Sequence, residues 1–295
     1  MPELPEVETM RRGIAPVVGY KIAAVERPRC RLKPIAVQPE LAQFRRRAVG
    51  KRIERVGRLG KRVLVYLEGD EVIVLEPRMT GLVLLADPPN REHLRLCLHL
   101  TTDAAASSPR ETHGEGQTLS LMYWDRRGLG SVRLLSVDEL NHRYREGILG
   151  PDALEISVEG LRERLGNSRR EIKVALLDQK AVAGIGNLYA SEMLFLARIH
   201  PKRPCHTLRK SDWQKLHTAM REVLEEAIRY EGSTLGDGTY RNALNQEGGY
   251  QNHHRVYARA GKNCPRCGHD SIVRTVQAQR ATFHCTRCQR EGNWS

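Results

Sequence analysis

The sequence predicts an α+β protein of more than one domain. An N-terminal helix on a β-sandwich is followed by helices and a C-terminal four-cysteine zinc finger. Three observations predict this fold class. The length of 295 residues suggests about two domains with a small appendage. The apolar pattern changes from a strand-like to a helical period near residue 136. Two CxxC pairs, CPRC and CTRC, stand near the end of the chain.

Residues 4–18 are predicted to form the first helix. Apolar side chains recur there at three- and four-residue spacing, as at Leu4, Val7 and Met10. Pro5 falls in the first turn, where proline is tolerated. Pro16 is expected to kink or end the helix near its last turn, because its ring removes a backbone hydrogen bond.

Short apolar segments bounded by Gly, Pro or charged residues then predict the strands of a β-sandwich. Within 94–100 leucine alternates with other residues, as in a half-buried antiparallel strand. The stretch 102–118 is rich in Ala, Ser, Thr, Gly and Glu and is expected to be a polar loop. The predicted strands cover 63–68, 72–77, 82–86, 94–100 and 118–124.

The second half of the chain carries a helical pattern. Its clearest segment is 211–231, where Ser211 and Gln214 predict a capping box and Gly232 predicts the end of the helix. The following stretch, 232–251, is rich in Gly, Asn and Gln and is predicted to be a mobile loop outside the core. The predicted helices cover 137–147, 157–166, 170–178, 187–199 and 211–231.

Four of the seven cysteines have the spacing of a zinc site. The two CxxC pairs lie 17 residues apart, so a hairpin can bring them together as two knuckles. Four thiolates fill a tetrahedral site and leave no position for water, so we expect one structural Zn²⁺. Cys30, Cys97 and Cys205 are expected to be ordinary buried thiols. The predicted ligands are Cys264, Cys267, Cys285 and Cys288.

The charge of the chain points to a polyanionic partner. The net charge is +13, and residues 253–295 hold eight Lys and Arg against two Asp and Glu. Nucleic acid is therefore the first candidate partner and an anionic membrane surface the second. No stretch approaches the roughly 20 apolar residues of a membrane span. The acidic N-terminal segment MPELPEVETM does not have the basic start of a signal peptide.

Three segments together resemble the bacterial formamidopyrimidine-DNA glycosylase family. They are PELPEVET at the start, GIGNLYASE at 184–192 and QRATFHCTRCQ across the second cysteine pair, in the family's order. The resemblance implies a helix–two-turn–helix unit before the zinc finger. It also implies a monomeric enzyme of the bacterial cytoplasm and nucleoid that acts on double-stranded DNA containing oxidised or abasic sites.

The implied activity is base-excision repair of oxidised purines, 8-oxoguanine and formamidopyrimidines, by a glycosylase that is also an AP lyase acting by β,δ-elimination. The expected domains are 1–135 for the catalytic helix with the sandwich and 136–150 for a linker. They continue with 151–252 for the helix–two-turn–helix domain, which includes a lesion-recognition loop at 232–251, and 253–295 for the zinc finger.

The resemblance assigns the catalytic groups residue by residue. After removal of Met1, the secondary amine of Pro2 is the expected nucleophile, because an α-amine titrates near ~8 and is partly neutral at pH 7. Glu3 matches the general acid and Glu6 a second carboxylate that orients the site; both also suit the first turn of a helix. Lys61 and Arg280 match residues that contact phosphates near the lesion.

Further matches imply DNA contacts. Met79, Arg127 and Leu129 stand where the family fills the space left by an extruded base. Asn187, at the start of the predicted helix after two glycines, matches a phosphate ligand and also suits an N-cap. Tyr240 is a candidate base contact in the loop 232–251.

The chain departs from the family pattern at three places. Leu129 stands where Phe is usual, and Gly128 replaces a second arginine. Glu76 with Pro77 occupies the place of His-Leu, and a carboxylate there is expected to repel the DNA backbone. Two other functions stay open at this point: an endonuclease VIII-like enzyme for oxidised pyrimidines, and a paralogue that binds damaged DNA without cutting it.

Overall fold

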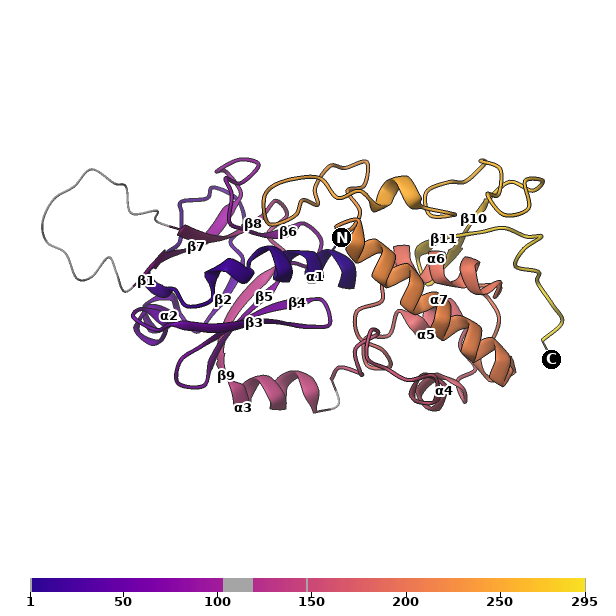
Figure 1. Cartoon of the computed structure of the whole chain (residues 1–295), viewed down its shortest axis with the longest axis horizontal. Helices are drawn as coiled ribbons and strands as arrows, with labels where there is room; N and C mark the ends of the chain where they lie inside the picture. Colours follow the sequence, from indigo (N-terminus) through magenta and orange to yellow (C-terminus); the bar gives the residue numbers. More distant parts are fainter. Residues whose placement is uncertain (1, 103–118, 147, 295) are drawn as a thin grey trace, which may run out of the picture. The chain divides into compact units, whose positions relative to one another are not determined.

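The chain forms two compact units in a computed structural model that describes residues 2–102, 119–146 and 148–294 (Figure 1). The first unit comprises Met1–Arg143 with Glu231–Gly248, and the second Tyr144–Tyr230 with Gly249–Ser295. The loop 231–248 thus belongs to the first unit, whereas the sequence analysis places it in the helical domain. The predicted loop at 102–118 lies, apart from residue 102, outside the described residues.

The first unit is a sandwich of two sheets. A four-stranded sheet has the order β1-β7-β8-β6, and a five-stranded sheet the order β2-β9-β5-β4-β3. Their facing side chains form one core with α1 and α2. The strands are β1 Lys21–Glu26, β2 Ala36–Gln38, β3 Ile53–Leu59, β4 Arg62–Leu67, β5 Glu71–Glu76, β6 Gly81–Leu84, β7 Leu94–Thr101, β8 Leu119–Asp125 and β9 Ser131–Ser136. The helices are α1 Leu4–Gly13, α2 Leu41–Ala48 and α3 Val137–Leu140.

The first helix is shorter than predicted. It ends at Gly13, and a 3-10 turn at Ala15–Val17 follows that contains Pro16. Gly13 lies against the loop of the same unit: a Cβ placed on it would come within 2.4 Å of the Ala243 side chain. The helix therefore ends three residues before Pro16, earlier than the sequence predicts.

The five strands predicted from alternation and apolar runs are present within one or two residues of their expected limits, and four more strands were not predicted. β3 illustrates the reason: its sequence IERVGRL carries three charged side chains, and only Ile53 is buried, so it has no alternating apolar pattern. β2, with only three residues, is too short to give a periodic signal.

The second unit contains four α-helices among its described residues and ends in the finger. α6 is buried on nearly every side, in keeping with its mostly apolar sequence. α7 begins one residue earlier than predicted, and at its start the Arg209 N–H donates to Oδ2 of Asp212 at 3.0 Å, so the predicted box of Ser211 and Gln214 is not formed. The helices are α4 Val158–Leu165, α5 Ile172–Leu176, α6 Asn187–Ala197 and α7 Lys210–Arg229; the finger hairpin is β10 Val273–Gln277 and β11 Arg280–His284.

None of the helices in the described ranges combines the length and apolar character needed to cross a bilayer.

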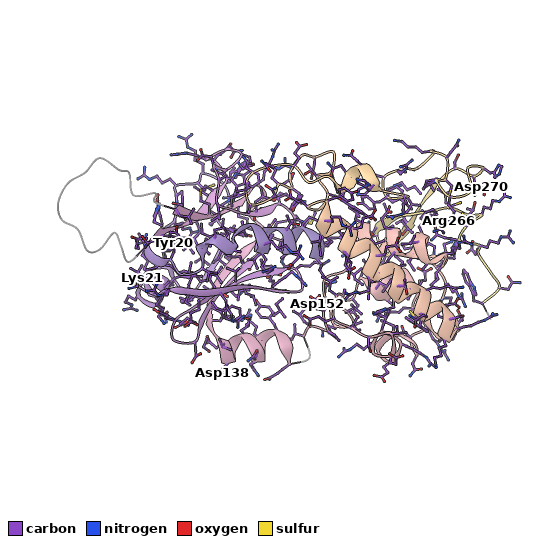
Figure 2. All side chains as sticks on the ribbon, in the orientation of Figure 1. Tyr20, Lys21, Asp138, Asp152, Arg266 and Asp270 are labelled. Carbon is purple, nitrogen blue, oxygen red and sulfur yellow. The ribbon has the colours of Figure 1, made fainter. Side chains whose placement is uncertain are left out.

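The finger is attached to α6 by a buried carboxylate. Glu192, which is 0% exposed, accepts backbone N–H bonds from Arg255 at 2.9 Å, Val256 at 2.9 Å and Tyr257 at 2.8 Å. Arg266, labelled in Figure 2, also links the finger to this helix, because it donates to the Phe195 carbonyl at 2.8 Å. The chain entering the finger is therefore fixed to the helix by backbone bonds.

Replacing Glu192 by Ala is expected to lower the free energy of unfolding of the second unit by roughly 3 kcal/mol or more, because one buried and two partly buried N–H groups lose their acceptor. Denaturant unfolding measures this change. Glu226→Ala is the control, since Glu226 makes one partly exposed ion pair with Arg255 at 2.9 Å. That pair contributes about 1 kcal/mol or less. Equal losses for the two variants would contradict the role of Glu192.

Candidate functional site

Three loops of the first unit open at the same end of the sandwich. In the strand registers Val63 pairs with Leu75 and Gly81 with Asp125. The β3–β4 turn, the loop 77–80 and the loop 126–130 therefore emerge together. They carry Lys61, Met79, Arg127 and Leu129, four of the residues predicted from the resemblance.

The first turn of α1 holds the predicted acidic residues. Pro2 and Glu3 are buried, and the Glu3 N–H donates to Oε2 of Glu6 at 2.8 Å in a capping box. The other oxygen of Glu6 accepts the N–H of Ser233 at 2.9 Å. Gly232 beside it has φ +77°, and a Cβ there would come within 2.9 Å of Glu6. Glu6 thus fixes both the residue next to Pro2 and the start of the loop 231–248.

A charged link joins α1 to the turn that carries Lys61. Nε of Arg58 lies 3.2 Å from Oε2 of Glu8, and its NH1 donates to the carbonyl of Gly60 at 3.0 Å. Burial opposes ionisation of Glu8, but hydrogen bonds from Arg11 and Arg12 and the charges of Arg11 and Arg58 hold its pKa below the ordinary value. In the sequence, Arg58 is only one more charge flanking Lys61.

A second buried carboxylate ties the loops 77–80 and 126–130 to each other. Asp125 is 0% exposed; its Oδ1 accepts the Thr80 hydroxyl at 2.5 Å and its Oδ2 the Gly130 N–H at 2.8 Å. The Arg127 N–H donates in turn to the Thr80 hydroxyl at 3.0 Å. The two loops therefore hold a fixed position relative to each other.

The apolar side chains on these loops point to solvent. Met79 is 37% exposed and Leu129 is 45% exposed, so neither fills the core. Arg127 is exposed beside Leu129. Large exposed apolar side chains next to an arginine suit insertion between stacked bases.

Glu76 is surrounded by arginines. Its Oε1 lies 2.9 Å from Arg62 and 3.2 Å from Arg78, and its Oε2 lies 3.4 Å from Arg133. Glu76 is 7% exposed, and the Arg78 side chain extends from it toward solvent. The expected repulsion of the DNA backbone does not follow, because three guanidinium groups outweigh one carboxylate and leave a positive surface.

Tyr240 is an anchor of its loop in this structure. It is 4% exposed, and its hydroxyl donates to the Glu231 carbonyl at 2.9 Å. Burial raises its pKa well above the usual value. Tyr240 and Ala243 belong to the core of the first unit, although the composition of 232–251 suggested a loop outside it. Asn242 makes this possible, because its Oδ1 accepts the N–H groups of Leu244 at 3.0 Å and Gln246 at 2.9 Å.

In the second unit, Asn187 meets a buried lysine and the finger hairpin. Asn187 is the first residue of α6, after the N-cap Gly186, and its side chain makes no cap. Its Oδ1 accepts from Nζ of Lys173 at 2.6 Å, and its Nδ2 donates to the Ala281 carbonyl at 2.9 Å. Lys173 is 0% exposed and also reaches the Ala281 carbonyl at 3.3 Å. No sequence signal marks Lys173, whose place in a short helix looks ordinary.

The Ala281 carbonyl follows Arg280, so the same contacts position Arg280. Gln277 and Arg280 pair across a two-residue turn. Ala278 and Gln279 in that turn have φ +44° and +62°, as a type I′ hairpin requires. Gln277 holds the hairpin to the helical body by a 2.6 Å bond to Glu171. Arg280 itself is exposed at the turn.

The four finger cysteines form a cluster of suitable size for zinc. All four Sγ atoms lie within 4.8 Å of one another, and the pairs 264–288 and 267–285 are each 3.8 Å apart. Tetrahedral Zn–S bonds of about 2.3 Å place sulfur atoms about 3.8 Å apart. The donor set therefore fits one structural zinc ion. Cys97 and Cys205 are buried as expected, whereas Cys30 is only half-buried.

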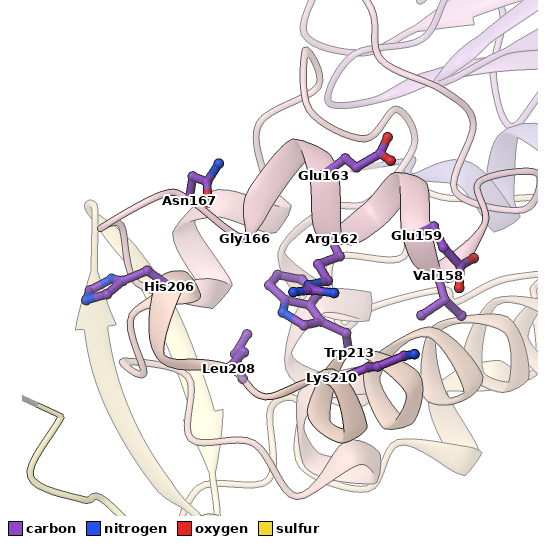
Figure 3. Close-up of a pocket in the computed structure, with 10 residues that line it drawn as sticks. All are labelled: Val158, Glu159, Arg162, Glu163, Gly166, Asn167, His206, Leu208, Lys210 and Trp213. Atoms are coloured by element: carbon purple, nitrogen blue, oxygen red, sulfur yellow. The ribbon is translucent and has the colours of Figure 1, made fainter.

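The second unit also contains a hollow of about 470 Å³ (Figure 3). Trp213 and side chains of both charges, among them Arg162 and Glu163, line it. It contains none of the residues predicted from the resemblance, and its mixed charges select no ligand.

The fold and the four-cysteine centre define a zinc-finger protein of the helix–two-turn–helix class. Residues 1–132 match the family model of the formamidopyrimidine-DNA glycosylase N-terminal domain, 149–238 that of its H2TH domain, and 261–290 a zinc finger found in FPG and IleRS.

Similar proteins cover the whole chain. The formamidopyrimidine-DNA glycosylase of Chloroflexus aurantiacus is 38% identical over 98% of each chain. A Lactococcus lactis FPG variant in complex with Fapy-dG containing DNA gives a TM-score of 0.83 at 32% identity, over 98% of this chain and 100% of that one. The Lactococcus lactis Fpg in complex with abasic-site DNA gives the same values. This chain belongs to the formamidopyrimidine-DNA glycosylase family.

Metal analysis of the purified protein is expected to find about one zinc per chain, because four thiolates form a closed site. Cys267→Ser should loosen the finger and weaken DNA binding, since the finger fold depends on the metal. Cys30→Ser, which changes a thiol outside the cluster, is the control. Protein that is active and contains no metal would refute the zinc assignment.

Asp125→Ala is expected to lower the free energy of unfolding by roughly 2–4 kcal/mol, because a buried hydroxyl and N–H groups lose their acceptor. Affinity for lesion-containing DNA should also fall at temperatures where the variant stays folded. Binding titrations alongside thermal unfolding separate the two effects. Asp87→Ala, at an exposed position of the same unit, should change neither. Unchanged affinity for the folded Asp125 variant would show that the two loops do not act together on DNA.

Proposed function

We propose that this chain excises oxidised purines from double-stranded DNA and then cleaves the strand at the resulting abasic site. One observation carries the proposal: Pro2 and Glu3 lie directly before a buried helix, and Glu6 caps that helix through the Glu3 N–H at 2.8 Å. A nucleophile and an acid are thereby held next to each other in the first unit. Family membership supports the same reaction class.

Pro2 supplies the nucleophile once Met1 is removed. Its neutral secondary amine attacks C1′ of the damaged nucleotide, the glycosidic bond breaks with its electron pair leaving on the base, and the base takes up the proton that the amine loses. Glu3 donates a proton to the sugar ring oxygen as the ring opens. The resulting iminium ion carries a positive charge without further protonation. It withdraws electrons from the sugar, so that C–H bonds weaken and the 3′ and 5′ phosphates leave in turn.

The remaining residues bind and distort the duplex. Lys61 of the first unit binds backbone phosphates. Asn187 and Arg280 of the second unit do the same. Removing a base from the stack leaves a void, which Met79 and Leu129 fill. Arg127 faces the base opposite the lesion and favours cytosine through its planar donors.

The zinc ion takes no part in the chemistry in this proposal. It holds the hairpin whose turn presents Arg280, while Lys173 and Asn187 fix the carbonyl that follows it. The chain acts as a monomer in the bacterial nucleoid, in keeping with the bacterial relatives it resembles.

Borohydride reduction on duplex oligonucleotides with 8-oxoguanine opposite cytosine tests the reaction. The processed protein is expected to form a stable crosslink, and mass spectrometry should locate it on Pro2. Protein that retains Met1 or a tag before Pro2 should bind the DNA without crosslinking, because an amide nitrogen is not nucleophilic. Undiminished trapping by the blocked protein would overturn the assignment of Pro2 and make Lys61 the first alternative.

Glu3→Gln separates the acid from the nucleophile in the same assay. It should reduce base excision by about 10²-fold or more, as expected for loss of a general acid. Activity on preformed abasic sites should be partly spared, since no glycosidic bond remains to be broken. Glu40→Gln, an exposed carboxylate of the same unit, is the matched control. A duplex with an oxidised pyrimidine tests the endonuclease VIII-like activity in the same assay. Binding of damaged DNA without any trapping would instead support the paralogue that does not cut.

A further inference from the structure

The segment between β1 and β2 is strongly basic. Residues 27–33, hereafter the basic loop, have the sequence RPRCRLK, with a cation at every second position and no acidic residue. All four cations are exposed: Arg27, Arg29, Arg31 and Lys33. This loop has no part in the function proposed above.

The charges of the basic loop are not used inside the protein. Elsewhere in the first unit arginines pair with carboxylates, as Arg47 does with Glu71 at 2.5 Å and Arg58 with Glu8 at 3.2 Å. Within the described part of the chain, none of the four loop cations forms an ion pair. Four closely spaced positive charges repel one another, so an external anion would stabilise them.

The backbone of the basic loop lies against the loop 126–130. Arg95, which is 2% exposed, donates to the Lys33 carbonyl at 3.1 Å and to the Asp125 carbonyl at 2.8 Å. Gly128 lies so close that a Cβ on it would come within 2.7 Å of the Lys33 carbonyl oxygen. Gly128 also has φ +64°, which favours glycine. The basic loop therefore has a fixed place beside Arg127 and Leu129.

The sheet order places the basic loop and Lys61 at opposite edges of the sandwich. The basic loop joins β1 and β2, which are edge strands of the two sheets. Lys61 lies in the β3–β4 turn at the other edge of the five-stranded sheet, where α1 also contacts β3, β4 and β6. The loops that carry Met79, Arg127 and Leu129 emerge between these edges.

We propose that the basic loop binds backbone phosphates of the DNA strand opposite the damaged nucleotide. The proposal rests on the function proposed above, in which Pro2 and Lys61 engage the damaged strand and Arg127 faces the opposite base. When the loops that carry Met79, Arg127 and Leu129 insert between the two strands of a duplex, one strand lies at each edge of the sandwich. The opposite strand then runs along the edge that carries Arg29 and Arg31.

A phosphate-neutralisation cycle tests the strand assignment. The protein is the full zinc-loaded chain, and the DNA is a duplex with a tetrahydrofuran abasic analogue opposite cytosine. Neutral methylphosphonates replace phosphates near the analogue on one strand or the other. Affinities are measured for the native protein and for the double variant Arg29→Ala/Arg31→Ala. Arg46→Ala, which removes an exposed arginine on α2 of the same unit, is the control.

Methylphosphonates on the opposite strand should weaken binding by the native protein about tenfold and leave the double variant nearly unaffected. The double variant should also flatten the slope of log K against log salt by about 2, because each phosphate that the protein neutralises contributes roughly −0.9 to that slope. Arg46→Ala should leave the slope unchanged. Thermal unfolding of the arginine variants should match that of the native protein, because the changed side chains are exposed.

Two outcomes would overturn the proposal. If the loop arginines couple to phosphates of the damaged strand, the basic loop binds that strand and the proposed strand is wrong. If methylphosphonates lower the DNA affinity of the native protein and of the double variant equally, the basic loop does not contact those phosphates. Borohydride trapping at saturating protein, on the duplex with 8-oxoguanine opposite cytosine, tests the proposed function separately, because the tetrahydrofuran analogue has no base to lose and forms no iminium. If the native protein is trapped but the loop arginines do not couple to phosphates of the opposite strand, only the role proposed for the basic loop is refuted. If they couple but the protein is not trapped, the role of the loop is supported and the proposed chemistry is refuted.

Discussion

The functional parts of this protein depend on hydrogen bonds from loop and backbone groups to buried carboxylates. Glu6 accepts from Glu3 and Ser233, Asp125 from Thr80 and Gly130, and Glu192 from three residues at the start of the finger. Each carboxylate is at most 2% exposed. Burying a charged group is costly unless its lone pairs are satisfied, so each of these positions admits one arrangement of the attached chain. Loops that carry exposed functional side chains thereby become rigid at their base.

Some arginines of this protein pair with carboxylates and support the fold, whereas other cations stay exposed and can bind an external anion. Arg58 spans the Glu8 carboxylate and the carbonyl of Gly60, and the cluster around Glu76 holds Arg62 and Arg133 in place. The net charge of +13 shows that many cations remain beyond such pairs. Exposed cations gathered beside exposed apolar side chains, as around Arg127 and Leu129, give a surface suited to a polyanion with stacked bases.

The departures from the family pattern acquire physical reasons in the structure. Glu76 does not present a bare carboxylate to the outside, because three arginines surround it. Gly128 has a left-handed backbone and touches the Lys33 carbonyl, so a side chain at that position would collide with the basic loop. Leu129 is exposed, as the predicted role in filling the duplex requires, but it offers less surface for stacking than an aromatic ring would have.

Apolar periodicity and cysteine spacing determined the sandwich strands with long apolar runs, the long helix α7 and the four-cysteine cluster, because these signals are local. The family resemblance singled out Pro2, Glu3, Lys61, Asn187 and Arg280, but their roles remain predictions. Only the tertiary structure showed that Tyr240 is buried in the core and that Lys173 supports Asn187. It alone brought Arg95 between two loops. Such contacts join residues from 14 to more than 60 positions apart, and no local pattern encodes which distant carbonyl a buried cation will meet.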